Sequence, residues 1–121
     1  MLAKKHRLNL ALTENSQMFR AGLSQQFAGE NLLFYYRPNN GGLKIAAIAP
    51  SRIYPKAHQR NHYRRLLYQL IVEIDKEIKE LKKPSLFDKD LDLIVVYKKQ
   101  DFVESDLKKD LITFFRKYEI I

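Results

Sequence analysis

The chain of 121 residues contains no cysteine. A disulfide framework, a zinc site built on thiolates and a cysteine nucleophile are therefore excluded. No stretch approaches the ~18 apolar residues of a membrane span, and the N-terminal "MLAKKHRLNLAL" lacks the long apolar region of a signal peptide. We therefore expect a cytoplasmic protein, and its length favours a single domain over residues 1–121 with one core.

Acidic residues are scarce in the first part of the chain, and none occurs between Glu30 and Glu73. Residues 1–68 hold 11 Lys or Arg and 2 acids, whereas residues 69–121 hold 11 and 12. The first part therefore carries a net charge of +9 and the second −1, which together give the +8 of the whole chain. This asymmetry indicates a polyanionic partner, either a nucleic acid or an anionic membrane surface, although a solvated basic face would also produce it.

Hydrophobic patterning predicts the element order α-β-β-α-β-α. The helices are expected at residues 13–21, from after Pro55 to about Lys82, and at 101–118. The strands are expected at 31–36, 43–49 and 92–97. Because "RPNNGG" combines residues that favour turns, it predicts a hairpin between the first two strands. Pro84 is expected to end the long helix, since proline cannot continue one.

The long helix is predicted to have two different faces. An apolar stripe at intervals of three and four residues predicts the core side, formed by Tyr63, Leu67, Leu70, Ile74, Ile78 and Leu81. A neighbouring arc near the helix N-terminus carries Arg60, Asn61, Arg64, Arg65 and Tyr68. Cations so close together repel one another, and phosphate groups would relieve that repulsion. Helix N-terminal amides also attract anions.

The segment "RIYPKAHQRNHYRRLL" resembles the signature of the bacterial ribonuclease P protein subunit. In that family a basic segment leads into a helix of the type Ala-His-x-Arg-Asn-Arg-x-Lys-Arg-Leu. The residues that match are Lys56, Ala57, His58, Arg60, Asn61, Arg64, Arg65 and Leu66. "KKHRL", "MFRAG" and "LLFYYRPN" are similar to the family's N-terminal basic segment, first helix end and first strand, so the resemblance spans nearly the whole chain.

The sequence departs from the family signature at two places. His62 stands where the family has the second arginine of its Arg-Asn-Arg motif. Because an unperturbed histidine is mostly uncharged at pH 7, a phosphate contact there is expected to be weaker or pH-dependent. Ser51 and Arg52 replace a pair of lysines ahead of the signature, so that connection is expected to contact RNA differently.

The resemblance implies an α+β sandwich in which a small, mostly antiparallel sheet packs on a long basic helix, like domain 2 of ribosomal protein S5. It also implies the accessory protein subunit of an endoribonuclease that removes the 5′ leader from precursor tRNA. The expected partners are ribonuclease P RNA and precursor tRNA, without a membrane or DNA. The catalytic centre and its Mg²⁺ are expected in the RNA subunit, so no catalytic residue or metal ligand is assigned to the protein.

The resemblance also implies two groups of binding residues. The catalytic RNA is expected to contact Arg52, Lys56, His58, Arg60, Asn61, His62, Arg64, Arg65 and Tyr68. The leader is expected in a cleft between the sheet and the first helix, at Lys5, Arg7, Phe19 and Tyr35. Aromatic rings there could stack on unpaired bases. Phe34 is a further candidate, because strand alternation places Phe34 and Tyr36 opposite Tyr35 and leaves open which side faces the cleft.

Other arrangements of functional residues are less well supported. "DKDLD" begins like a calcium loop, but Leu93 and Lys99 stand where such a loop needs Gly and Glu. His58 and His62 are four residues apart, yet the neighbouring arginines disfavour a metal there. Two alternatives to the ribonuclease P subunit remain open. One is a stand-alone RNA-binding module, such as a ribosome-associated protein or an RNA chaperone, and the other is an independent protein nuclease.

Overall fold

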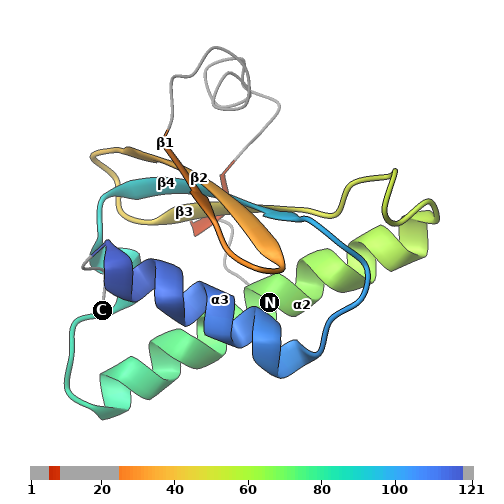
Figure 1. Cartoon of the computed structure of the whole chain (residues 1–121). Helices are drawn as coiled ribbons and strands as arrows, with labels where there is room; N and C mark the ends of the chain where they lie inside the picture. Colours follow the sequence, from red (N-terminus) through yellow and green to blue (C-terminus); the bar gives the residue numbers. More distant parts are fainter. Residues whose placement is uncertain (1–5, 9–24, 119–121) are drawn as a thin grey trace.

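The computed structural model describes residues 6–8 and 25–118 (Figure 1). Four strands form one sheet in the order β1-β2-β4-β3. Their bounds are Gln25–Ala28 (β1), Leu32–Pro38 (β2), Lys44–Ile48 (β3) and Leu91–Tyr97 (β4). Helices α2 (Ala57–Glu80) and α3 (Glu104–Lys117) cover one face of the sheet (Figure 1), and a short 3₁₀ helix, η3, spans Leu86–Asp88. The helix expected at residues 13–21 lies outside the described residues.

The predicted hairpin between the strands at 31–36 and 43–49 is wrong. β4 lies between β2 and β3, pairing antiparallel with β2 and parallel with β3. The turn does reverse the chain, but the two strands it joins do not pair with each other. The sequence reading also missed β1, because its four residues "QQFA" are mostly polar and exposed and carry no alternating apolar pattern. The α+β sandwich with a mostly antiparallel sheet is confirmed.

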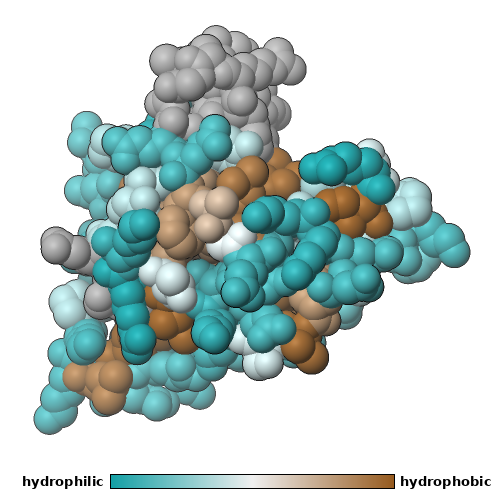
Figure 2. Space-filling model, in the orientation of Figure 1, coloured by the Kyte–Doolittle hydropathy of each residue, from teal (hydrophilic) through white to brown (hydrophobic). Residues whose placement is uncertain are grey.

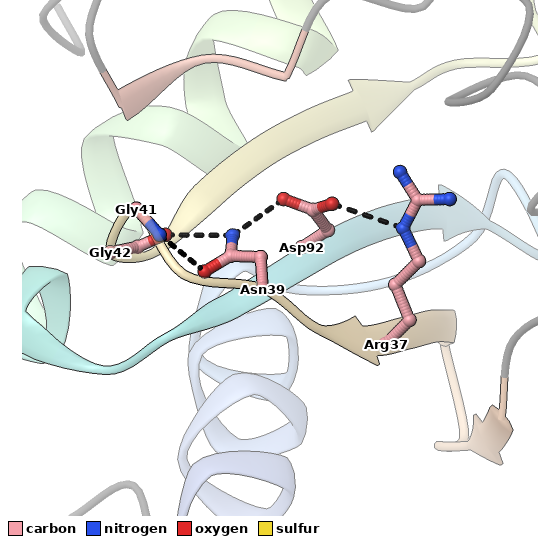
Figure 3. Close-up of polar contacts among 5 residues, drawn as sticks. All are labelled: Arg37, Asn39, Gly41, Gly42 and Asp92. Carbon is pink, nitrogen blue, oxygen red and sulfur yellow. Dashed lines mark hydrogen bonds and ion pairs between the residues drawn. The ribbon is translucent and has the colours of Figure 1, made fainter.

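A buried carboxylate of β4 holds the turn that joins β2 to β3 (Figure 3). Asp92 accepts a hydrogen bond of 2.6 Å from Asn39 Nδ2 and forms an ion pair of 3.0 Å with Arg37 Nε. Asn39 Nδ2 also donates to the Gly42 carbonyl at 2.9 Å. Gly42 has φ +82°, and a Cβ there would lie 2.8 Å from the Phe87 carbonyl oxygen. The turn therefore requires glycine at this position, both for its conformation and for its close packing.

Strand alternation divides the three consecutive aromatic residues of β2 between the two faces of the sheet. Phe34 and Tyr36 are buried under α3, where the Phe34 ring stacks on Phe114 with centroids 4.5 Å apart. Tyr35 lies on the opposite face and packs with the cluster of Leu8, Ala46 and Ile94. The predicted alternation is confirmed. Phe34 is excluded as a base-stacking residue, because its side chain is fully buried.

Helix α2 buries most of the predicted apolar stripe. Leu67, Leu70, Ile74 and Ile78 are buried and Tyr63 is half-buried, as expected. The prediction for Leu81 is wrong, because that side chain is 68% exposed. The helix ends at Glu80, and the chain reverses at Lys82, where φ is 60°. Leu81 therefore leaves the helical register before it can reach the core.

Two buried acids connect the helices to other segments. Asp75 of α2 accepts hydrogen bonds of 2.8 Å from Ser85 Oγ and the Leu86 amide. Asp110 of α3 accepts bonds of 2.8 and 3.1 Å from the amides of Asn31 and Leu32. These charge-assisted bonds fix the segments that enter η3 and β2. Among the described residues, no helix is long and apolar enough to cross a membrane.

Candidate nucleic-acid interface

The strand directions bring the basic segment of the chain to one end of the sheet. Because β3 and β4 are parallel, the segments that follow them leave the sheet at the same end (Figure 1, right). After β3 the chain passes through residues 49–56 into the first turns of α2. The opposite end holds the turn between β2 and β3 together with "DKDLD". We call residues 52–65 the basic end, and Figure 2 shows mostly hydrophilic side chains over this part of the molecule.

Four aromatic rings pack together beneath the surface of the basic end: Tyr54, Tyr63, Tyr97 and Phe102. Tyr54 stacks on Tyr63 with centroids 4.2 Å apart, and the ring of Phe102 stacks on Tyr97 at 5.5 Å. Tyr97 meets Tyr54 and Tyr63 edge to face, at 5.5 and 5.6 Å. The Tyr97 hydroxyl also donates a hydrogen bond of 2.7 Å to the Tyr63 carbonyl. This aromatic cluster joins the segment before α2, the helix itself and the end of β4.

Burial changes the acidity of two hydroxyls in the aromatic cluster. The Tyr54 side chain is fully buried, and its hydroxyl has no hydrogen-bond partner in the described structure. Burial, with smaller contributions from Tyr63 and Asp101, raises the pKa of Tyr54 to about 12. Burial likewise raises the pKa of Tyr97 well above its ordinary value. Both phenols therefore stay protonated to higher pH than an ordinary tyrosine; Tyr54 acts as a packing group, and Tyr97 also donates to the Tyr63 carbonyl.

Arg60 also has a role within the protein. Its Nη1 atom donates to the carbonyls of Tyr54 and Pro55, at 3.0 and 2.8 Å. The half-buried guanidinium thus fastens the entering segment to the helix, and its Nε and Nη2 atoms have no partner among the described residues. Arg60 was predicted as an RNA contact, and only these remaining groups are placed to make one.

Most other cations of the basic end are exposed and lack an acidic partner. Of the three ion pairs in the described part of the chain, none involves a residue of the basic end. The exposed residues predicted to contact RNA are Arg52, Lys56, His58, Asn61, His62, Arg64 and Arg65. Arg64 donates to the side chain of Asn61, and the His62 ring lies edge-on to Tyr63 at 4.9 Å. The surface is therefore positively charged, and no acid in the described part of the chain neutralises it.

The first turn of α2 adds backbone donors to this surface. The helix has no acid in its first turn, and the Lys56 amide donates to Gln59 Oε1 at 3.4 Å. The amides of Ala57 and His58 have no partner among the residues that the structure describes. These amides and the surrounding cations favour the same ligand, an oxyanion such as a phosphate.

Part of the Tyr68 side chain already makes contacts within the protein. Its hydroxyl accepts a hydrogen bond of 3.1 Å from the Ala47 amide of β3. The ring is half-buried against the core. Tyr68 therefore fastens α2 to the outer edge of the sheet, which limits the part of its side chain that RNA can reach.

The residues predicted to bind the leader do not form one group in the described structure. Tyr35 is half-buried on the sheet face away from α2 and α3. Arg7 is exposed at the outer edge of β3, where it pairs with Ile45. Since Ile45 faces the helices, the pairing directs the Arg7 side chain to that side as well. Lys5 and Phe19 lie outside the described residues.

The acidic groups of the described residues do not gather into a metal site. Within residues 6–8 and 25–118, no group of three or more potential ligands could hold a metal ion. Asp90 of "DKDLD" accepts a hydrogen bond of 3.0 Å from the Gly42 amide. A pocket of about 340 Å³ lies between the β1–β2 turn and α3. Its lining carboxylates, Glu30, Asp106 and Asp110, outnumber the amine of Lys109, so it does not suit a phosphate.

Comparison with known proteins identifies the family. The model of the ribonuclease P family matches residues 2–119. The chain belongs to the ribonuclease P protein family. No curated protein sequence matched it significantly. The resemblance of "RIYPKAHQRNHYRRLL" to the family signature is thereby confirmed.

Solved structures share the fold of the family. The chain is similar to the RNase P protein from Thermotoga maritima, with 16% identity, a TM-score of 0.68, and coverage of 92% of this chain and 96% of that one. It also resembles Staphylococcus aureus RNase P protein, with 12% identity, a TM-score of 0.62 and coverage of 95% and 96%. A mutant of the Staphylococcus protein described as defective in mRNA degradation activity gives 12% identity, a TM-score of 0.67 and coverage of 96% and 90%. At these identities the similarity shows the fold alone.

The buried hydroxyls of Tyr54 and Tyr97 allow a matched test of the aromatic cluster. Tyr54→Phe should equal wild type or be more stable by up to about 1 kcal/mol, because it removes a buried hydroxyl without a partner. Tyr97→Phe should lose about 1–2 kcal/mol, because it deletes the bond to the Tyr63 carbonyl. Urea unfolding at pH 7.5 measures both. A loss above about 1 kcal/mol in Tyr54→Phe would show that this hydroxyl has a partner.

The raised pKa of Tyr54 also predicts the direction of a pH effect. Below pH 10 the Tyr54 phenol is neutral in both the folded and the unfolded chain. As the pH rises from 10 towards about 12, the phenol ionises first in the unfolded chain, so the wild-type protein loses folding stability over this range. The stability of Tyr54→Phe relative to wild type should therefore grow between about pH 10 and 12. A constant difference over that range would contradict the assignment.

Proposed function

We propose that the protein is the RNA-binding subunit of ribonuclease P and assists removal of the 5′ leader from precursor tRNA. The main support for this proposal comes from the basic end. There the cations of residues 52–65 lie on one surface without acidic partners in the described structure. Such a surface binds the phosphate backbone of RNA. Membership of the family supplies the identity of that RNA, the ribonuclease P RNA, as the partner we propose.

We place the catalytic centre in the RNA subunit. Hydrolysis of a phosphodiester requires an activated nucleophile and stabilisation of the phosphoryl transition state, which nucleases often provide with metals held by converging carboxylates. The three buried acids have a different role, since Asp75, Asp92 and Asp110 accept hydrogen bonds that hold the fold. The side chains of the basic end are mostly cationic nitrogen groups and include no carboxylate, so they do not suit Mg²⁺, which prefers oxygen ligands. We propose that the RNA and the substrate phosphates hold this ion.

The protein would then act mainly through binding. Cations and amides at the basic end bind the phosphates of substrate and product alike, and uniform binding of this kind improves substrate capture more than it speeds the chemical step. The leader is proposed to lie along the sheet face of Tyr35, where a base can stack on the ring. Tyr35 is chosen because Phe34 and Tyr36 are buried on the other face.

Charge reversal at the basic end tests the RNA interface. Arg64→Glu combined with Arg65→Glu should weaken binding to ribonuclease P RNA at least 10-fold and flatten the slope of log affinity against log salt by about 2. Arg60 is left unchanged, because its guanidinium supports the fold. The matched control is Lys76→Glu with Lys83→Glu, which changes the charge equally at exposed residues near the other end of α2. Equal affinity and salt slope in both folded variants would disprove the interface.

The sheet face can be tested with two variants of one residue. In the reconstituted enzyme, Tyr35→Ala should weaken binding of precursor tRNA about 5- to 100-fold, because stacking contributes ~1–3 kcal/mol per base. Mature tRNA has no leader, so its affinity should change little. Tyr35→Phe keeps the ring and should bind the precursor like wild type. If Tyr35→Ala weakens both RNAs equally, the residue does not contact the leader.

Reconstitution distinguishes the proposal from its alternatives. The purified protein with Mg²⁺ should not cleave precursor tRNA, whereas the protein with its cognate RNA should cleave it, bind it more tightly and need less Mg²⁺ than the RNA alone. RNA binding without any such stimulation would favour a stand-alone RNA-binding module. Cleavage without RNA that disappears in Asp88→Asn would favour a protein nuclease. Asp88 suits this test because it is exposed, whereas Asp90 and Asp92 hold the turn.

A further inference from the structure

The segment that follows β4 carries two lysines that the sequence reading did not include in the interface. Lys98 and Lys99 belong to residues 69–121, where acids and bases nearly balance. The register of the parallel strands pairs Ile48 of β3 with Val96 of β4. Both strands therefore end at the same level, and residues 98–102 leave the sheet beside residues 50–55 (Figure 1).

Direct contacts hold these two segments together. Gln100 Nε2 donates a hydrogen bond of 3.3 Å to the carbonyl of Ile53, the residue after Arg52. Phe102 packs against both Tyr97 and Tyr63, with centroids 5.5 and 5.7 Å apart. The aromatic cluster that supports the basic end thus also fixes the segment carrying the two lysines.

The two lysines are exposed, and the backbone of Lys98 is anchored. The Lys98 amide donates to the Asn31 carbonyl and its Nζ to the Gly29 carbonyl, both at 3.0 Å. Neither lysine forms an ion pair with any residue that the structure describes. Asp101 and Glu104 follow in the chain, yet neither pairs with them. Lys99 therefore carries a positive charge without an acidic partner among the described residues, one residue before Gln100, which contacts Ile53. The Lys98 amine is directed instead to the Gly29 carbonyl of the β1–β2 turn.

We propose that the segment after β4 forms, through Lys99, a second phosphate-binding element of the RNA interface, which binds the same RNA region as Arg52 and Lys56. The inference rests on the proposed function and extends its binding surface from the first half of the chain to the segment after β4. Two segments that lie far apart in the sequence would then bind the same stretch of RNA backbone, and the aromatic cluster would hold both segments in place.

Charge reversal tests the contribution of this element to affinity. Lys99→Glu should weaken binding to ribonuclease P RNA about 5-fold and flatten the salt slope by about 0.7–0.9, the value for one phosphate contact. Lys83→Glu is the control, since it makes the same change at an exposed lysine beyond the other end of α2. Arg64→Glu with Arg65→Glu is measured alongside. If that pair has no effect, both the proposed interface and this extension fail. If it weakens binding while Lys99→Glu matches Lys83→Glu, only this inference fails.

The absence of cysteine makes a second test possible. Lys99→Cys, Arg52→Cys and Lys83→Cys each introduce a unique thiol that can carry a photo-crosslinker. Bound to ribonuclease P RNA, the probes at 99 and 52 should crosslink to overlapping nucleotides, and the probe at 83 should not. Crosslinks from 99 and 52 to unrelated regions, or none from 99 when 52 reacts, would overturn the proposal.

Discussion

The aromatic cluster of Tyr54, Tyr63, Tyr97 and Phe102 is the contact on which the basic end depends. It joins the segment after β3, the first turns of α2 and the end of β4 at one place. Mutually repelling cations would disperse on a loosely held chain, because no acids in the described structure neutralise them. Apolar packing fixes the surface without adding negative charge to it. Arg60 completes this support by bonding two carbonyls of the entering segment.

The distribution of acids complements this arrangement. Asp75, Asp92 and Asp110 are buried and accept hydrogen bonds that fasten a helix or a turn. Carboxylates thus stabilise the fold, while the basic end has none in its helix first turn. A protein organised in this way can bind a polyanion strongly but has few groups suited to phosphodiester hydrolysis. This division is consistent with our proposal that the RNA partner performs the chemistry.

Local patterns in the sequence predicted the local features of the structure. The 3.6-residue stripe located the buried face of α2, and strand alternation separated Tyr35 from Phe34. Long-range pairing was not predictable, because β4 enters between β2 and β3 only after α2 has returned the chain. The hydrogen bonds of Arg60 to two backbone carbonyls could not be predicted for a related reason. These carbonyls belong to a segment whose path depends on tertiary packing. The family signature in residues 52–67, rather than periodicity, indicated the function.

We propose that RNA binds at the end of the sheet where β3 and β4 finish, and hydrogen exchange measured on the whole chain tests this most directly. Amide exchange would be compared with and without ribonuclease P RNA. We expect added protection at residues 52–65 and 98–100, with little change in the turn at 38–43 and at residues 88–92. Protection concentrated at the turn and at 88–92, with none at the basic end, would contradict the account.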